Sequence, residues 1–314
     1  MKKNLLTFAG ALICCLLWGS AIPSIKLGYE LWNIEGNDTW TIIAFAGIRF
    51  FLAGVLVILI SSIIKRKFLL PRLKEIKDIF ILSLFQTIGQ YIFFYLGLAH
   101  TSGVNTAVVD SLTTFFAIIM ASLVFKMEKL TGRKLLGCAL GFTGVLVINL
   151  SGGEYHINLL GDLLVAMSAL CYGVSSVLIK KYSKEHDTVL FSGYQFMMGG
   201  LVMVIVSMFG GQKIISKTAL SPAYFDGQAY KAVLILLYLS LISSVAYTLW
   251  GILLRTNDVS KISIFGFMTP IFGVILSAIL LGEGLGLKYL IALLFIGLGI
   301  ITVNYQKNLD HSTD

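Results

Sequence analysis

Charged side chains are scarce in this sequence. Only 13% of its 314 residues are charged, whereas 57% are apolar, and the mean hydropathy is +0.88. A water-soluble domain of this size could not carry so much apolar surface. The composition therefore indicates an integral membrane protein whose solvent is lipid.

Residues that hold metals, cofactors and phosphates are scarce as well. None of the four histidines pairs with another at ligand spacing, and both His-Glu-x-x-His and the phosphate loop Gly-x-x-x-x-Gly-Lys-Ser/Thr are missing. The four cysteines fall inside long apolar runs, where they behave as small apolar side chains: Cys14, Cys15, Cys138 and Cys171. We therefore expect no metal, cofactor, disulfide framework, ATP-driven pumping or enzymatic activity.

Long apolar runs recur along the whole chain. Most are close to the roughly 20 residues that a helix needs to cross the hydrocarbon core. The first run follows two lysines, as in a secretory signal, but it is too long for one and more membrane follows. We predict about ten spans: Phe8 to Leu27, Thr41 to Ile64, Ile79 to Leu98, Ser102 to Phe125, Lys134 to Leu150, Leu159 to Ile179, Val189 to Phe209, Ala232 to Leu253, Ile262 to Leu281 and Leu287 to Tyr305.

The net charge of +8 has a topological explanation. If the amino terminus is cytoplasmic, the loops on that side hold Lys65, Arg66, Lys67, Arg72, Lys74, Lys77, Lys126, Lys129, Arg133, Lys134, Lys180, Lys181, Lys184, Arg255 and Lys261. The other side holds only Lys26, Lys213, Lys217, Lys231 and Lys288, mixed with acidic residues. The positive-inside rule then places both termini in the cytoplasm. Because these charges lie in short loops, no nucleic-acid partner is expected.

The chain also repeats itself. A shift of 155 positions aligns Thr101 with Thr256 and Gly144 with Gly299, among others. A shift of 154 sets Trp18-Gly19 on Tyr172-Gly173, and a shift of 146 sets Phe45, Gly47, Phe50 and Gly54 on Phe191, Gly193, Phe196 and Gly200. Residues 1–150 and 151–314 therefore form two five-helix repeats, the second ending in a short cytoplasmic tail. An odd number of spans per repeat inverts the second copy, a plan that recurs in secondary transporters.

Several short motifs recur in a characteristic order. They are Trp18-Gly19-Ser20, Pro23 and Lys26; Arg49-Phe50; Gly97-Leu98-Ala99 and Thr101-Ser102; Glu128-Lys129-Leu130-Thr131 and Gly137; and Gly282-Glu283-Gly284. Over nearly its whole length the chain resembles EamA-type members of the drug/metabolite transporter superfamily. The resemblance implies ten helices, alternating access, and a central cavity lined mainly by helices 1, 3, 4, 6, 8 and 9. Family members often carry a proline in both helices 4 and 9; here Pro270 is present but Phe115 takes the other position, which puts a symmetric pair of hinges in doubt.

Two ionisable side chains lie deep inside predicted spans. Arg49 and Asp110 each stand about eight residues from the outer end of a span, roughly 12 Å deep. Such a group needs a partner or a wet cavity. Either the two form a structural ion pair, or Arg49 faces a substrate carboxylate and Asp110 an ammonium group. Asp110, on a face of small and polar residues, is also a candidate proton carrier, because a desolvated carboxylate binds protons more readily.

Other spans offer polar and aromatic residues that suit a substrate site. The full set of predicted substrate-binding residues is Trp18, Arg49, Gln86, Gln90, Tyr91, Asp110, Thr114, Tyr172 and Tyr247. The alternative is that such residues serve close helix packing, as Gly137 and Gly141 are expected to do. Predicted gating residues are Pro270, Gly266 and Gly273, which would loosen the ninth span, with a merely tolerated kink as the alternative.

The function expected from these observations is secondary active transport in the cell membrane. We expect small polar metabolites, amino acids preferred, to be exported by alternating access with proton coupling through Asp110. The alternatives are a carrier of larger metabolites, such as a nucleotide derivative or a lipid-linked sugar, and a membrane assembly subunit without transport activity. The expected partners are a small-molecule substrate and the lipid bilayer, and a homodimer is left open.

Overall fold

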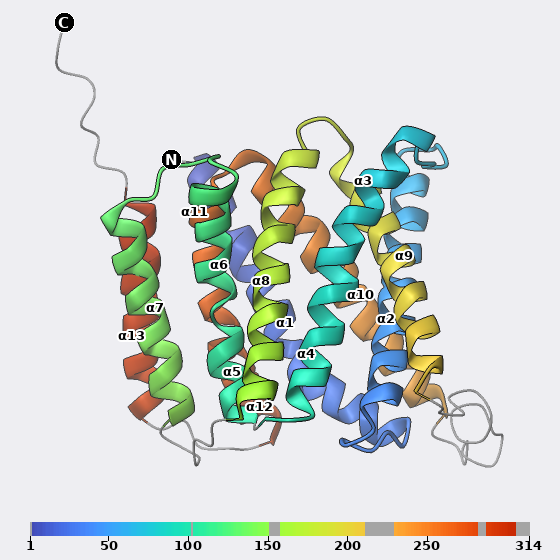
Figure 1. The fold of residues 1–314 in the computed structure, drawn as a ribbon, viewed down its shortest axis with the longest axis horizontal. Coiled ribbons are helices and arrows are strands. Elements are labelled where there is room, and N and C mark those ends of the chain that lie inside the picture. The colour runs from blue at the N-terminus through green and yellow to red at the C-terminus, as the bar shows by residue number, and fades with distance from the viewer. Residues whose placement is uncertain (1, 102, 151–157, 211–228, 282–286, 306–314) are drawn as a thin grey trace, which may run out of the picture.

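Every regular element that the computed structural model describes is a helix (Figure 1). The structure describes residues 2–101, 103–150, 158–210, 229–281 and 287–305. Within these residues, nine helical segments are long and apolar enough to cross a membrane. A further helix, Gly132–Leu150, stands at the place of the predicted fifth span and is numbered with the spans below. The predicted all-α membrane fold is therefore confirmed.

The spans, numbered here in chain order, follow the predicted sequence of apolar runs. The first half contains α1 (Lys2–Leu31), α2 (Thr39–Ile64), α3 (Leu73–Ser83) continued by a π-helical turn (Leu84–Gly89) into α4 (Gln90–Leu98), then α5 (Gly103–Asp110), α6 (Thr113–Ile119) with a second π-helical turn (Met120–Val124), and α7 (Gly132–Leu150). The second half contains α8 (Leu159–Tyr182), α9 (Thr188–Met208), α10 (Ala229–Thr256), α11 (Val259–Ser263), a 3₁₀ turn (Ile264–Phe267), α12 (Met268–Leu281) and α13 (Leu287–Asn304). Span 3 is thus α3 with α4, span 4 is α5 with α6, and span 9 is α11 with α12.

Spans 3 and 6 are among those that extend further into polar sequence than predicted. Span 3 begins at Leu73 rather than Ile79, because the Arg72 backbone N–H donates to Glu75 Oε2 at 2.7 Å and stabilises a charged first turn. Span 6 continues to Tyr182, because Lys180 Nζ donates to the Asn257 carbonyl at 2.5 Å. Apolar content alone does not reveal helix ends that other parts of the chain stabilise.

Equivalent helices of the two halves pack against each other. Spans 2 and 7 meet along their glycines: a Cβ on Gly54 would lie 2.4 Å from the Gly193 carbonyl oxygen, and one on Gly200 would lie 2.5 Å from the Gly47 carbonyl oxygen. Glycine is required here because the two backbones touch. In the 146-residue alignment Gly47 corresponds to Gly193 and Gly54 to Gly200, so the contacts are reciprocal, as at a two-fold axis.

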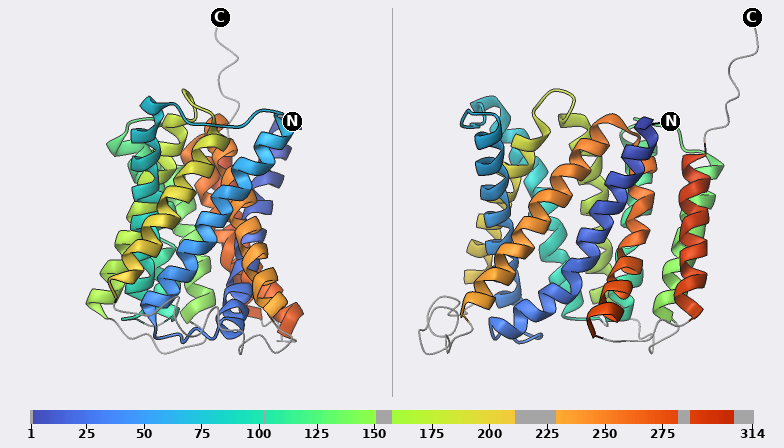
Figure 2. Two further views of the ribbon diagram at one scale, coloured as in Figure 1. Left: turned by 90° about the vertical axis from the view of Figure 1, so that its right-hand side faces the viewer. Right: turned by 180° about the vertical axis from the view of Figure 1, so that it is seen from behind.

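Spans 5 and 10 show the same reciprocity at one edge of the bundle, where α7 and α13 stand side by side (Figures 1 and 2). A Cβ on Gly137 would lie 2.8 Å from the Gly299 carbonyl oxygen, and one on Gly144 would lie 2.8 Å from the Ala292 carbonyl oxygen. In the 155-residue alignment Gly137 corresponds to Ala292 and Gly144 to Gly299. A Cβ on Gly299 would lie 3.0 Å from the backbone nitrogen of Gly141, so the predicted seam at Gly137 and Gly141 is confirmed.

The inner spans exchange partners between the halves. A Cβ on Gly19 in span 1 would lie 2.8 Å from the Gly273 nitrogen in span 9. Its counterpart Gly173 in span 6 meets span 4, 2.7 Å from the carbonyl carbon of Phe116. Each half therefore packs its first helix on the fourth helix of the other half, which is the interleaving expected of inverted repeats.

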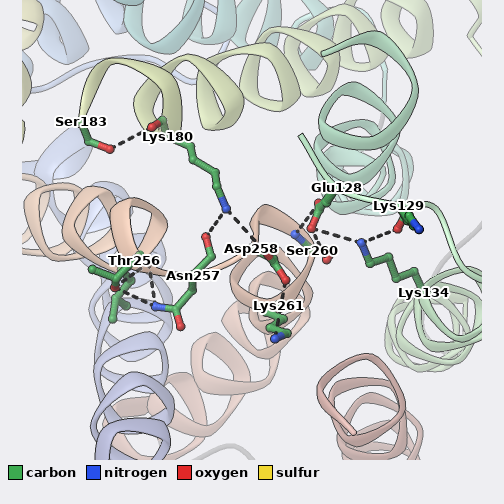
Figure 3. A network of polar contacts seen from close by, with 11 residues as sticks. Glu128, Lys129, Lys134, Lys180, Ser183, Thr256, Asn257, Asp258, Ser260 and Lys261 are labelled. Atoms are coloured by element: carbon green, nitrogen blue, oxygen red, sulfur yellow. Dashed lines mark hydrogen bonds and ion pairs between the residues drawn. The ribbon is translucent and has the colours of Figure 1, made fainter. Parts of the chain in front are cut away.

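One end of the bundle carries most of the described basic residues, and we call it the basic end. It holds the start of α1, the end of α13 and the loops 65–72, 125–131, 183–187 and 257–258 (Figure 1). A polar network crosses it (Figure 3): Glu128 accepts from the Ser260 hydroxyl at 2.8 Å and pairs with Lys134 at 3.1 Å, while Lys180 reaches Asn257 and Asp258. The network joins spans 4, 5, 6 and 9.

A packed apolar layer lies near the basic end on spans 1, 4, 6, 8 and 9. Its residues come from five spans and have at most 1% of their surface exposed: Ala11, Cys15, Ala117, Val177, Leu254 and Phe265. Phe8 packs edge-to-face on Phe265, with the ring centroids 4.9 Å apart. Together with the polar network, this layer packs spans 1, 4, 5, 6, 8 and 9 against one another near the basic end.

Asp187 at the basic end supports a prediction on stability. Its Oδ1 accepts from the Val189 N–H at 2.9 Å and caps α9, while Oδ2 contacts Lys65 Nζ. Burial raises the pKa of Asp187, but the Lys65 ammonium and the Leu190 and Val189 N–H groups outweigh it and hold the pKa below its ordinary value. The resulting stability is present above the ordinary pKa of about 4 and is lost as the pH falls through the lowered pKa.

We therefore expect Asp187→Ala to lower the free energy of unfolding by about 1 kcal/mol at pH 7, mostly through the lost cap, since a half-exposed ion pair contributes little. Asp187→Asn keeps a capping side chain and should cost less. Thermal unfolding in detergent should show wild type and Asp187→Asn converging as the pH falls to about 3. A constant difference between these two proteins from pH 7 to pH 3 would contradict the ionised cap.

Candidate functional site

An aromatic cluster occupies the middle of the bundle. We define it as Trp18, Phe50, Tyr91, Phe196 and Tyr247, from spans 1, 2, 3, 7 and 8. Trp18 lies 5.1 Å from Tyr247, and Phe50 lies 4.4 Å from Tyr91, measured between ring centroids. Trp18 also packs against Trp250 at 4.9 Å. Three of the predicted substrate-binding residues, Trp18, Tyr91 and Tyr247, thus come together.

The cluster follows the internal symmetry of the chain. Phe50 and Phe196 are repeat equivalents, and their rings stack with centroids 5.4 Å apart and an interplanar angle of 13°. The hydroxyl groups of Tyr91 and Tyr247, one from each half, hydrogen-bond to each other. Tyr172, the repeat equivalent of Trp18, is half-buried and interacts electrostatically with Tyr91 and Tyr247. The cluster therefore lies where the two halves meet.

Arg49 is a buried cation beside this cluster. Only 5% of its surface is exposed, and its guanidinium carbon lies 4.7 Å from the centre of the Phe50 ring. Its charge also acts on the hydroxyl groups of Tyr91 and Tyr247. Among the described residues Arg49 forms no ion pair, and its Nε has no hydrogen-bond partner. Aromatic faces and phenols alone compensate weakly for a buried charge, so the site can accept an anionic group.

Asp110 ends α5 and is half-buried. It acts electrostatically on Tyr247, as Arg49 does from span 2, so Tyr247 is within reach of both charges. In the part of the chain that the structure describes, Asp110 and Arg49 form no ion pair with each other. The predicted structural ion pair is therefore not the arrangement found in this conformation.

Gln195 in span 7 is a site residue that the sequence analysis missed. Its exposed fraction is 0%, its Oε1 accepts from the Thr87 hydroxyl at 2.7 Å, and its Nε2 has no partner among the described residues. The 146-residue shift that aligns Phe50 with Phe196 also aligns Arg49 with Gln195. The repeat alone could therefore have identified it, as it could have identified the stacked phenylalanines.

The remaining predicted substrate-binding residues differ in whether their polar atoms already have hydrogen-bond partners. Gln86 is buried within the π-helical turn of span 3, and Gln90 follows that turn with its Oε1 buried and unpartnered in the described structure. π-Helical turns are frequently found at functional sites. The Thr114 hydroxyl, by contrast, donates to the Ser263 carbonyl at 3.2 Å and so joins spans 4 and 9.

Spans 4 and 9 are interrupted at equivalent levels. Span 4 breaks at residues 111–112, where the Leu112 N–H donates to the Val109 carbonyl at 3.0 Å and the Ser111 hydroxyl to the Val108 carbonyl at 2.6 Å. In span 9 the 3₁₀ turn covers residues 264–267, which the 155-residue shift aligns with 109–112. Span 4 is therefore interrupted by local hydroxyl and 3₁₀ bonding without a proline, although Phe115 stands at the position equivalent to Pro270.

The predicted gating residues play different parts. Pro270 lies in the first turn of α12, where its missing N–H costs little. Gly266 lies in the 3₁₀ turn, and a Cβ added to it would lie 3.5 Å from Thr114 Oγ1. Gly273 lies against Gly19, so it serves close packing between spans 1 and 9. The regular α-helical hydrogen bonding of span 9 is therefore interrupted at the 3₁₀ turn that contains Gly266, and the gating role of the three residues stays a prediction.

With this geometry established, the comparison with known proteins decides the family. The sequence model of the family described as "EamA-like transporter family" matches residues 5–150 and again residues 159–305. The chain belongs to the EamA-like transporter family. Its two matches lie on either side of residues 151–158.

Relatives and a solved structure agree with this assignment. The uncharacterized transporter YvbV of Bacillus subtilis is 28% identical over 269 residues, covering 84% of this chain and 82% of its own. The uncharacterized inner membrane transporter YedA of Escherichia coli K12 is 25% identical over 303 residues, covering 95% and 89%. A crystal structure that is 16% identical superposes with a TM-score of 0.74 over 95% of this chain and 96% of its own, and shows the fold alone. This EamA-like protein is a multi-pass transporter of the cell membrane.

Proposed function

We propose that this EamA-like transporter carries small zwitterionic metabolites, with amino acids preferred, and exports them by alternating access. The observation that carries the proposal is Arg49, a buried cation without a carboxylate partner among the described residues. A substrate carboxylate would supply the missing anion, and two charge-assisted hydrogen bonds to a guanidinium are favourable at low dielectric. The export direction is taken from the family resemblance.

Asp110 supplies the second half of the proposed site. It lies within electrostatic reach of Tyr247, which Arg49 also influences, and in the described structure the two opposite charges form no ion pair with each other. A substrate with an ammonium and a carboxylate group would meet one charge at each end. The aromatic cluster, which includes Tyr247, suits the apolar part of such a molecule.

The closed basic end supports the transport cycle. By the positive-inside rule this end is cytoplasmic. The network around Glu128 and the apolar layer close it, whereas Trp18, Tyr91, Tyr172 and Asp110 keep solvent-accessible surface. Under the proposal this is the conformation closed to the cytoplasm, and its alternate would open the network of Figure 3.

We expect Asp110→Asn to abolish transport driven by a pH gradient and to leave substrate exchange across proteoliposomes measurable but with weaker substrate affinity, because the proposed contact with the substrate ammonium group loses its charge. The reason is that the amide keeps the size and hydrogen bonds of the carboxyl group but cannot carry a proton. The measurement is uptake of radiolabelled amino acids, with nucleotides as competitors, with and without a pH gradient. Glu35→Gln, at an exposed loop carboxylate, is the matched control.

The outcomes separate the parts of the proposal. Full gradient-driven uptake by Asp110→Asn would refute proton coupling through this residue. Competition by nucleotides, with no amino acid moving, would replace the proposed substrate class by larger anionic metabolites.

A further inference from the structure

A second polar pocket lies at the basic end, apart from the aromatic cluster. Its volume is about 540 Å³, and its lining residues come from the end of α2, the loop before α9, the first turn of α9 and the last turns of α10. The lining residues are Lys65, Lys184, Glu185, His186, Asp187, Thr188, Val189, Ile252 and Arg255. Nothing in the transport proposal uses these residues.

The pocket has free positive charge. Lys65 is paired with Asp187, which neutralises both. Lys184 and Arg255 are exposed and form no ion pair with any residue that the structure describes. Glu185, also exposed, offsets one of these two cations, and the amino-terminal end of the 21-residue α9 adds partial positive charge.

His186 does not neutralise this charge. Its ring nitrogens lie 3.1 Å from Glu75 Oε1 and 3.6 Å from Asp78 Oδ2, and its ring stacks on Phe191. Both carboxylates belong to α3 and are occupied by this contact. The imidazole is therefore held by span 3 and leaves the cations of the pocket unpaired.

Thr188 provides an independent sign of a missing ligand. It is the first residue of α9, lines the pocket and has only 6% of its surface exposed. Its hydroxyl Oγ1 is buried and has no hydrogen-bond partner among the described residues. A buried hydroxyl without a partner costs free energy, which an oxygen-rich anion in the pocket would recover.

The apolar side of the pocket shows where its ligand comes from. Ile252 lines the pocket and is 42% exposed, and it continues a stripe on α10 with Val245 (44% exposed) and Leu241 (45% exposed). Residues four and seven apart share a helix face, and in a membrane such an exposed apolar face contacts acyl chains. The stripe ends at Arg255, where a lipid headgroup would lie.

From these features we infer that the pocket binds the phosphate headgroup of an anionic phospholipid of the cytoplasmic leaflet. Lys184 and Arg255 bind the phosphate oxygens, the Thr188 hydroxyl donates to one of them, and an acyl chain follows Ile252 and Val245. Basic pockets between spans on the cytoplasmic side are recurrent sites for such headgroups.

The test uses native mass spectrometry of the purified full chain with phosphatidylglycerol and with phosphatidylcholine of the same acyl chains. We expect Lys184→Gln/Arg255→Gln to retain phosphatidylglycerol about 30-fold less well, taking the usual contribution of two basic residues near a membrane surface. The control Lys67→Gln/Lys129→Gln removes two exposed charges from the same end. It should change retention by less than about twofold. An equal loss in both variants would mean diffuse attraction and would overturn the site.

Two further experiments test the role of the Thr188 hydroxyl and the identity of the ligand. Thr188→Val should weaken phosphatidylglycerol retention without any change of charge, and Thr188→Ser should restore it; identical retention in the three proteins would remove the hydroxyl from the proposal. Displacement of the lipid by millimolar inorganic phosphate would show a site for soluble phosphate and overturn the lipid assignment. Thermal unfolding of each variant separates a lost site from a lost fold.

Discussion

Arg49→Met is expected to lower transport by about 100-fold or more without destabilising the protein. Truncating one partner of a buried charge pair costs roughly 2 to 5 kcal/mol of binding, and here the partner is the proposed substrate carboxylate. In the protein itself Arg49 forms no ion pair among the described residues, so its removal leaves no buried carboxylate behind. Saturable uptake in proteoliposomes and thermal unfolding of the same preparation measure the two quantities.

The prediction separates a substrate site from a structural one. A structural ion pair would make Arg49→Met lose about 3 to 5 kcal/mol of stability, because it would leave an uncompensated buried charge. Arg133→Met is the matched control, since Arg133 is exposed at the basic end. An Arg49→Met protein with lowered thermal stability but unchanged substrate affinity in its folded form would contradict the proposed site. A stable Arg49→Met protein that no longer transports would support it.

Gly54→Ala and Gly200→Ala are expected to cost about 3 kcal/mol of stability each, or to prevent folding. Added Cβ atoms would lie 2.4 Å from the Gly193 carbonyl oxygen and 2.4 Å from the Phe51 backbone nitrogen, so spans 2 and 7 must separate. Overpacking of this kind typically costs 1 to 3 kcal/mol, and rigid backbone atoms cannot move aside as a side chain could. Unfolding in a denaturing detergent gives the difference.

Gly297 in α13 provides the control for these two substitutions. A Cβ there meets nothing within 4 Å. Gly297→Ala should therefore stabilise the protein by up to about 1 kcal/mol, since alanine is the better helix former. Equal losses at Gly54, Gly200 and Gly297 would show that the close contact between spans 2 and 7 is not what requires glycine.

Much of the fold was predictable because the bilayer simplifies it. Apolar runs of about 20 residues mark spans directly, and an odd number of spans per repeat inverts the second copy. Errors at helix ends fell where polar contacts stabilise a terminal turn: Glu75 caps the charged start of span 3 locally, and Asn257, far along the chain, accepts from Lys180 at the end of span 6. Neither contact leaves a mark on hydropathy.

The site was less predictable, for a physical reason. Deep charge and aromatic character identified Arg49, Asp110 and Tyr247, because such residues are costly or rare in a span. Side-chain direction could not be read from the chain, so Thr114, which joins two helices through its hydroxyl, looked the same as a substrate contact. Gln195 was missed for a different reason. An amide side chain by itself does not indicate a site, and only the alignment of the two repeats shows that Gln195 is the equivalent of Arg49.

The reciprocal glycine contacts also record how the chain arose. If a single five-helix ancestor paired with an inverted copy of itself, one mutation at such a glycine would have altered the interface twice, once in each copy. After fusion of the two copies, each position became free to change alone. Ala292, which stands where the first half has Gly137, is one such change: its side chain is tolerated although a Cβ on Gly137 would lie 2.4 Å from Val303. Under that history, gene fusion would relax a doubled constraint, and the same freedom accounts for a cation at Arg49 where the repeat equivalent is the neutral Gln195.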